Sequence, residues 1–451
     1  MKRALQGILL LLGPLVVVGC VSPDGDTDSL DRAAAIPESP SRGERPAPDA
    51  AAARDVVDDH EDATSSSGDP LSVDEAVRLA LGASPRAEAA RQRVAAESAR
   101  AGAEGAFPEP VLSAGVEALP FDSPREEEEW LVGLSLALPA PGERAAERDV
   151  ARARGATADA ALRRTLLEVD AATRAAFAEA FFAVEAQTLA EYAAALADER
   201  IELVEAEVET GAAAPLDLLD VREEQVRARH ARDASRREAV AARARLELLL
   251  PSPAHGRPLS GDVTAALALP ELEALLARME GLPQLAESAA EARLEALRAE
   301  LADARRIPRV ELAVAWRERA DGRASLDAGF GIALPFGGRR TAEASAASRD
   351  AAAAGALVRA RWREVREELL AAHAEARSAQ AELHMLRESL LPLARQRVTR
   401  AKSLVEVGTA SYGTVLEARA REAALAAEAL TASLRMHAAW ARLQPLLLAN
   451  G

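Results

Sequence analysis

The stretches GAAAPLDLLD, residues 211–220, and GTASYGTVLE, residues 408–417, are two versions of one motif that lie 197 positions apart. A second pair of marks agrees with them: the turn Pro-Ala-Pro-Gly at 139–142 is matched by Pro-Phe-Gly-Gly at 335–338, with an offset of 196. One period of roughly 200 residues indicates a duplicated structural unit rather than a solenoid of short repeats.

Each motif follows a long segment that we expect to be helical. Alanine, leucine, arginine and glutamate dominate the chain from residue 71 onward, and they are among the strongest helix formers. Residues 142–210 contain no proline, and a continuous helix of roughly 70 residues would be about 100 Å long. The matching segment, residues 338–407, contains a single proline, Pro392.

The glycines that open the two motifs, Gly211 and Gly408, are expected at the tips of two helical hairpins. A helix commonly ends at a glycine because the left-handed backbone conformation of its C-cap suits a residue without a Cβ atom. Shorter helices, at about 215–250 and 412–448, would then run back antiparallel to the long ones.

Residues 1–19 have the form of a lipoprotein signal peptide. An apolar run at 8–18 follows two basic residues and is too short to span a bilayer comfortably. Cys20, the only cysteine of the chain, follows small residues, so we expect cleavage before it and attachment of lipid to its thiol. An ordinary secretory signal with a chance cysteine is the alternative. Residues 20–69 are poor in core-forming side chains and are expected to be a lipid-anchored, disordered tether.

Between the helices, four runs alternate apolar residues with small or charged ones, and they predict strands at about 110–119, 130–138, 309–317 and 324–334. Membrane barrels show this alternation, with the apolar side toward lipid, although a soluble sheet with one wet face shows it too. The export signal favours a barrel. Trp130 and Trp316 also favour it, because they lie near strand ends, where an interfacial aromatic belt forms.

The number of strands predicts that several copies of the chain assemble. A closed barrel needs about eight strands or more, and an open sheet edge is not tolerated in lipid. Four strands per chain must therefore be pooled among copies. The acidic run from Glu126 to Glu129 lies between the first two strands, and we expect it in an external loop.

Composition argues against several function classes. The chain has 72 acidic and 55 basic residues, and the resulting net charge of −17 argues against a nucleic-acid partner. Its six histidines show no metal-ligand spacing, and no cysteine remains for nucleophilic chemistry once Cys20 carries a lipid. The sequence therefore predicts no enzyme, no metal site and no cofactor apart from the covalent lipid.

An ordered set of short marks runs through the chain: Val-Asp-Glu-Ala-Val at 73–77, Ser-Pro at 84–85, Phe-Pro at 107–108, the turn at 139–142, and Val-Gly-Thr at 407–409 leading into Val-Leu-Glu-Ala at 415–418. Together with the twice-repeated order of helix, strand hairpin, long helix and return helix, this set resembles the TolC family of outer-membrane efflux proteins over about residues 71–449. The lipidated start resembles the lipoprotein branch of that family, whose members serve as outer-membrane factors of RND-type efflux.

The resemblance implies a mainly α fold with a small β part, in which residues 70–256 form the first structural repeat and residues 257–451 the second. It implies a homotrimer in the outer membrane, with four strands per protomer in a twelve-stranded barrel that continues into a long periplasmic α-helical barrel. Hairpin tips at Gly211, Gly408 and Thr409 would contact a periplasmic adaptor protein that is attached to an inner-membrane pump. The protein would be a passive conduit for efflux, and its substrate stays open.

The resemblance also implies a periplasmic gate just past the tip glycines, where the family carries two acidic residues three positions apart. In the second repeat these positions hold Thr414 and Glu417, so Thr414 departs from the pattern; Asp217 and Asp220 hold the corresponding places in the first repeat. Threefold symmetry would make Glu417 a ring of three carboxylates that attracts cations and repels anions. The alternative for the three acids is stabilisation of a helix start by the helix dipole.

Two other functions fit parts of the sequence. A periplasmic adaptor subunit also contains a helical hairpin, but it would need β-rich flanks around a single hairpin, and this chain has two hairpins. A non-channel envelope lipoprotein scaffold would explain the helices and the lipid anchor, but it leaves the four alternating strands without a role.

Overall fold

The computed structural model describes residues 69–117, 129–261, 269–319, 322–333 and 337–448, which belong to one compact unit. The signal peptide, Cys20 and the tether up to residue 68 lie outside the described residues.

The first repeat consists of two short helices, a strand hairpin and a long helical hairpin. Ser72 and Ser84 set the helix boundaries, because their hydroxyls accept hydrogen bonds from the N–H groups of Glu75 and Ala87 and so cap the two short helices. Pro85 follows at the first helical position, where the helix has no use for an N–H. The elements are α2 (Val73–Ala83), α3 (Pro85–Ala103), β1 (Val111–Glu117), β2 (Glu129–Leu138), α4 (Glu143–Glu209) and α5 (Pro215–Glu247).

The second repeat has the same order of elements, which confirms the predicted internal duplication. It begins with the short helix α6 (Leu272–Ala277), and a proline again begins its second helix. The elements are α7 (Pro283–Ala304), β3 (Val310–Arg319), β4 (Ala324–Ile332), α8 (Arg339–Met385), a π-helical turn (Leu386–Leu390), α9 (Leu391–Glu406) and α10 (Tyr412–Leu448).

The long helix of the second repeat holds one residue more than α4. Whereas α4 is continuous over 67 residues, its counterpart is divided into 47 residues of α8, 5 of the π-turn and 16 of α9. A π-turn bonds to the fifth residue rather than the fourth, so it takes up one extra residue without breaking the helix. Pro392, just after the turn, lacks the N–H that a regular helix would use there. The π-turn thus accounts for the change of repeat offset from 196 to 197.

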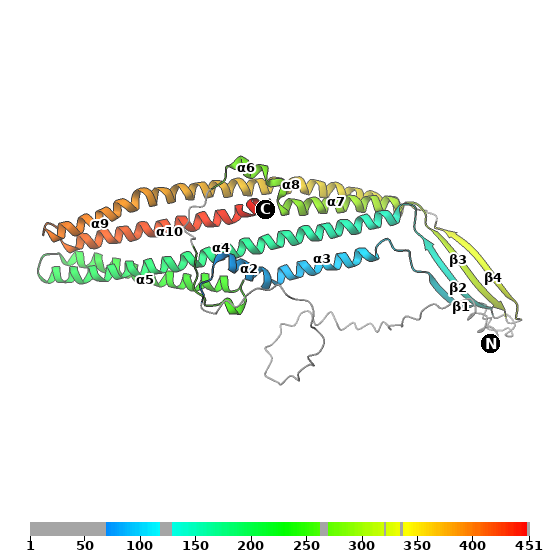
Figure 1. The fold of residues 1–451 in the computed structure, drawn as a ribbon, viewed down its shortest axis with the longest axis horizontal. Helices are drawn as coiled ribbons and strands as arrows, with labels where there is room; N and C mark the ends of the chain where they lie inside the picture. The colour runs from blue at the N-terminus through cyan, green and yellow to red at the C-terminus, as the bar shows by residue number, and fades with distance from the viewer. Residues whose placement is uncertain (1–68, 118–128, 262–268, 320–321, 334–336, 449–451) are drawn as a thin grey trace, which may run out of the picture. The chain divides into compact units, whose positions relative to one another are not determined.

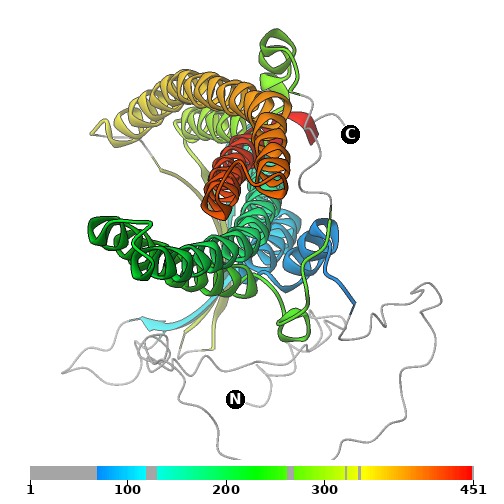
Figure 2. The same ribbon diagram turned by 90° about the vertical axis from the view of Figure 1, so that its left-hand side faces the viewer.

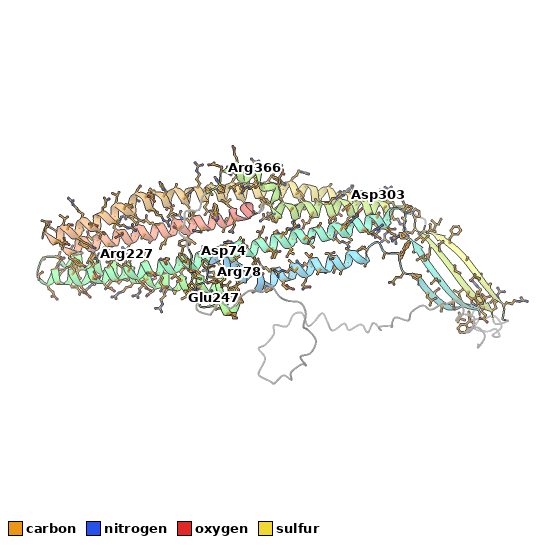
Figure 3. All side chains as sticks on the ribbon, in the orientation of Figure 1. Asp74, Arg78, Arg227, Glu247, Asp303 and Arg366 are labelled. Atoms are coloured by element: carbon orange, nitrogen blue, oxygen red, sulfur yellow. The ribbon has the colours of Figure 1, made fainter. Side chains whose placement is uncertain are left out.

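The helices run alongside one another, with the sheet at one end and both hairpin tips at the other (Figure 1). Viewed from the tips, the α4–α5 hairpin lies beside the hairpin of α9 and α10 (Figure 2). The labelled charged side chains are spread along the helical part, from Arg227 on α5 to Asp303 on α7 near the sheet (Figure 3). Among the helices of the described residues, none combines the length and apolar character that a membrane span requires.

Small side chains dominate the packing between helices. Phe177 of α4 is fully buried and packs in one cluster with Ala180, Ala242 and Leu246. Because the side chains at a contact set the distance between helix axes, buried alanines allow close packing. This explains how a chain with only 3% aromatic residues packs its helices closely.

The four strands form one antiparallel sheet in the order β1-β2-β3-β4, so β1 and β4 are its edges. The strand ends differ from the predicted ones by at most two residues. The register places Leu112 opposite Leu134, Leu134 opposite Val314, and Val314 opposite Ala328. Directly opposed residues share a face, so each such set forms a row across the sheet.

Candidate functional site

One face of the sheet is apolar from edge to edge, apart from Glu318 at the end remote from the helices. Its rows include Leu136, Leu312 and Phe330, and a second row runs from Leu112 to Ala328. These side chains are open to the surroundings: Leu112 is 72% exposed and Phe330 is 74% exposed. Such a contiguous apolar face requires an apolar environment, either a partner surface or lipid.

The two tryptophans of the strands lie on this apolar face. Trp130, the second residue of β2, is opposite Glu318, and Trp316 is opposite Val132 in the adjacent row. Because β2 leads into α4 at its other end, both indole rings lie toward the end of the sheet that is remote from the helices. Both rings are about half exposed.

The opposite face carries charges and small residues. The Glu129 carboxylate pairs with Arg317 at 2.8 Å and with Arg319 at 2.8 Å, and Arg317 also pairs with Asp327 at 3.1 Å. Gly133 lies in the row next to these charges, opposite Ser113 and Ala315. Apart from Val111 and Leu131, the side chains of this face are therefore charged or small.

The expectation that the run from Glu126 to Glu129 forms an external loop is wrong for Glu129. This residue is the first of β2, and it lies opposite Glu117 on one side and Arg319 on the other. The strand alternation directs it to the polar face, where two arginines compensate its charge. The other three glutamates lie outside the described residues.

A buried carboxylate joins the two repeats where the helices meet the sheet. Glu143, the first residue of α4, has a side chain with 0% exposure, and it accepts hydrogen bonds from Arg305 at 3.0 Å, from Arg309 at 3.1 Å and from the Ala140 N–H at 3.0 Å. Although burial acts to raise the pKa of Glu143, the hydrogen bonds from Arg309, Ala140 and Arg305 hold it below its ordinary value. No local pattern in the sequence predicts this cluster, because Arg305 and Arg309 lie more than 160 positions from Glu143.

The left-handed conformation expected at both hairpin tips is present. Gly211 has φ 77° and Gly408 has φ 73°. In the first tip the N–H groups of Gly211 and Ala212 donate to the carbonyls of Val208 and Glu207, and the second tip repeats both bonds. This is the Schellman motif, which satisfies the last carbonyls of a helix. Thr409, at the second tip, donates from its hydroxyl to the Leu404 carbonyl at 3.0 Å.

The acids and the threonine beyond the tips are all exposed. The Asp217 carboxylate accepts a hydrogen bond from the Ala214 N–H at 2.9 Å, so it acts as a cap of α5. Asp220 lies further along α5. The Thr414 N–H donates a hydrogen bond to the Ser411 carbonyl at 3.1 Å. Glu417 lies further along α10.

Glu417 takes part in a contact between the two hairpins. Arg200 of α4 pairs with Glu417 of α10 at 3.2 Å, and with Glu224 of its own hairpin partner α5 at 2.8 Å. Arg200 is thus shared between an acid of each repeat. Sequence reasoning missed Arg200, because an arginine inside a long charged helix carries no local signal of its partner.

The described residues contain no group of three histidine, cysteine or acidic side chains that could hold a metal ion. The features that stand out are the two-faced sheet, the joint at Glu143 and the paired hairpin tips.

The fold is shared with solved outer-membrane proteins. The outer membrane protein VceC of Vibrio cholerae has a TM-score of 0.68 at 17% identity, with 83% of this chain and 95% of that chain covered. The outer membrane channel MtrE of Neisseria gonorrhoeae has a TM-score of 0.67 at 15% identity, with 83% and 88% covered. CusC, described in terms of folding and transmembrane channel formation, has a TM-score of 0.67 at 17% identity, with 83% and 91% covered. A comparison with curated protein sequences gave no match.

Part of the sequence matches a known family. Residues 279–447 match the family model described as outer membrane efflux protein. The match runs from the turn before α7 almost to the end of α10, so it covers the second repeat, and the first repeat has the same order of elements. The resemblance inferred from the sequence is thereby confirmed over residues 279–447, which are similar to the outer membrane efflux protein family.

Proposed function

We propose that the chain is the outer-membrane channel subunit of a tripartite efflux system and serves as a passive conduit from the periplasm to the outside. The observation that carries the proposal is the four-stranded sheet, which has one exposed apolar face, one charged face and two unpaired edges. Apolar outside and polar inside is the pattern of a membrane barrel. Three copies would supply twelve strands and leave no edge open in the lipid.

The helical part suits a tunnel across the periplasm. At about 1.5 Å per residue, the 67 residues of α4 extend roughly 100 Å from the sheet. The two hairpins of each protomer would form one third of the tunnel wall, and their charged residues would keep the wall hydrated. Energy for transport would come from an inner-membrane pump.

The hairpin tips are the proposed contact with a periplasmic adaptor protein that links the channel to that pump. Both tips end in the same compact Schellman turn at Gly211 and Gly408, and both present apolar side chains to the surroundings. Leu216 is 66% exposed, and Val407 is 69% exposed. Exposed apolar residues at a rigid tip are suited to docking onto another protein.

The contact of Arg200 with Glu417 and Glu224 is the proposed closure of the periplasmic end. While it is formed, the hairpins of the two repeats are held together; opening of the channel would separate Arg200 from Glu417. In the open state a ring of Glu417 carboxylates would favour cations. Asp217, Asp220 and Thr414 would line the same end.

Cys20 is the proposed lipid attachment site, with residues 20–69 as the tether that connects the lipid to the channel. The lipid would hold each copy at the outer membrane before assembly. The two rival functions, an adaptor subunit and a scaffold lipoprotein, do not explain a sheet that is apolar on one face and unpaired at both edges.

The proposal is tested by conductance of the purified oligomer in planar lipid bilayers. We expect stepwise currents with a preference for cations, and we expect Glu417→Gln to weaken that preference. Glu422→Gln is the matched control, because Glu422 lies on the same helix but pairs with Arg395 inside its own hairpin at 3.4 Å. Oligomers that insert without conducting would contradict the channel function, and equal selectivity of the two variants would contradict the role of Glu417.

A further inference from the structure

The joint between helices and sheet is built twice, once in each repeat. Gly142 before α4 and Gly338 before α8 are both left-handed, with φ 83° and φ 72°. Arg144 bonds the Gly105 carbonyl and lies 3.9 Å over the Phe107 ring, and Arg340 bonds the Ile307 carbonyl. Positions 196 apart are therefore equivalent at the helix starts.

At the start of the strands, the equivalent positions are 200 apart. Phe-Pro at 107–108 matches Ile-Pro at 307–308, and Leu112 matches Leu312. The register agrees, since Leu112 faces Leu134 of β2 and Leu312 faces Phe330 of β4, 196 positions further on. It follows that Glu109 corresponds to Arg309.

Inside one chain, the first repeat meets the second in a defined way. Strand β2 pairs with β3, with Leu136 opposite Leu312 and Leu134 opposite Val314. Beside this pairing, Glu143 at the start of α4 binds Arg309, the residue before β3. The β2–β3 pairing and the Glu143–Arg309 contact together form part of the interface between the first and the second repeat.

The outer edges, β4 and β1, are left unpaired in the chain. A second copy can repeat this interface, with its first repeat placed against the second repeat of the first copy. Strand β4 then pairs with the β1 strand of the second copy in the same way as β2 pairs with β3. The equivalences then place Ile332 opposite Leu112 and Phe330 opposite Ala114. Both pairs extend the apolar rows of the sheet, so the faces of the two copies stay continuous.

The repeated interface also places the equivalents of Glu143 and Arg309 together at the boundary between copies, but with the acidic and basic residues exchanged. Arg339 occupies the place of Glu143, and Glu109 occupies the place of Arg309. Resting on the proposed channel function, we propose that Arg339 of one copy binds Glu109 of the next, beside a β4–β1 strand pairing. The surface formed by β4, Arg339, Glu109 and β1 is thus a docking site for a second copy of this chain.

Both residues are free to make this contact. The Arg339 side chain is 88% exposed and pairs only with Glu343, one turn further along its own helix, among the pairs of the described residues. Glu109 is exposed at the opposite edge of the sheet. An exposed pair within one helix is weak, so Arg339 can turn to a carboxylate of a neighbouring copy.

The exchange of charges also selects the correct neighbour. If the first repeats of two copies met, Glu143 would face Glu109; if the second repeats met, Arg339 would face Arg309. Each wrong contact sets like charges against each other, whereas the alternation of first and second repeats sets opposite charges together at every joint. Repulsion in wrong pairings is an established source of specificity.

The test is disulfide cross-linking in the full-length chain in its membrane, with Glu109→Cys and Arg339→Cys combined. Positions on β1 and β4 of one chain are separated by three strand spacings, roughly 14 Å, which a disulfide cannot bridge. We therefore expect covalent oligomers on non-reducing gels and none from either single variant. Glu109→Cys with Asp350→Cys is the matched negative control, because Asp350 lies about 16 Å further along α8.

A second pair separates the possible failures. Leu112→Cys with Ile332→Cys tests the strand pairing alone. If this pair cross-links and the Glu109 and Arg339 pair does not, the proposed ion pair is overturned while the channel function stands. If the unmodified chain forms no oligomer, both are overturned.

Charge exchange gives an independent readout that does not depend on cysteine chemistry. Arg339→Glu and Glu109→Arg should each lower the temperature at which the oligomer dissociates, and the double variant should recover much of the loss. The losses of the two single variants would simply add if the residues did not interact, and that result would overturn the proposal.

Discussion

Glu143→Gln is expected to loosen the two repeats of each chain. The Glu143 carboxylate is fully buried, and two arginines and one backbone N–H donate to it. Hydrogen bonds to a charged group contribute about 1.5–3 kcal/mol each. The two arginines are about half exposed, so water would replace part of what they lose. We therefore expect a loss of about 2–3 kcal/mol per chain, less than a fully buried ion pair would give.

The loss is measured as the heat-induced dissociation temperature of the detergent-solubilised oligomer, followed on gels and by circular dichroism. A shift of roughly 2–6 °C is expected from the size of the loss and of the chain. Glu147→Gln is the matched control, because Glu147 lies one turn further along α4, keeps a single contact with Arg305 and is partly exposed. The dissociation temperature of Glu147→Gln should fall by less than a loss of about 1 kcal/mol would cause. Equal shifts for both variants would refute the view that Glu143 ties the repeats together.

Three further predictions concern Glu143, the hairpin tip at Gly408 and the lipidation site at Cys20. The lowered pKa of Glu143 means that its contribution to stability is present at neutral pH and is lost as the pH falls through that pKa, so the difference between wild type and Glu143→Gln should shrink on acidification; a constant difference would contradict this. Gly408→Pro, or deletion of residues 408–413, should abolish export and leave the oligomer intact, because proline cannot adopt φ 73°. Gly355→Ala, with open space around the added Cβ, is its control, and unchanged export in the Gly408 variant would count against the tip assignment. Cys20→Ser should lose palmitate labelling in growing cells, and persistent labelling would refute lipidation there.

Local patterns in the sequence were sufficient to predict the strands and the hairpin tips. Two-residue alternation identified all four strands within one or two residues, and the tip glycines gave both Schellman turns. These features are decided by residues that are neighbours in the chain. The charge density of the four glutamates suggested a loop, whereas Glu129 is the first residue of β2 and lies on its polar face.

Contacts between distant positions could not be predicted in the same way. Glu143 and Arg309 are separated by 166 positions, and Arg200 and Glu417 by 217. Nothing in the sequence near Glu143 or Arg200 reveals the partner on the other repeat. The π-turn did leave a trace, since the repeat offset changes by one between the turn at 335–338 and the motif at 408–417, and one inserted residue inside a helix is what a π-turn accommodates.

The central claim is that the two-faced sheet is embedded in lipid and completed by other copies of the chain. Its most direct test is native mass spectrometry of the purified protein, with and without detergent. The account predicts a complex of three copies in detergent and aggregation when the detergent is removed. A single copy that stays monodisperse in detergent-free buffer after removal of residues 1–68 would contradict it.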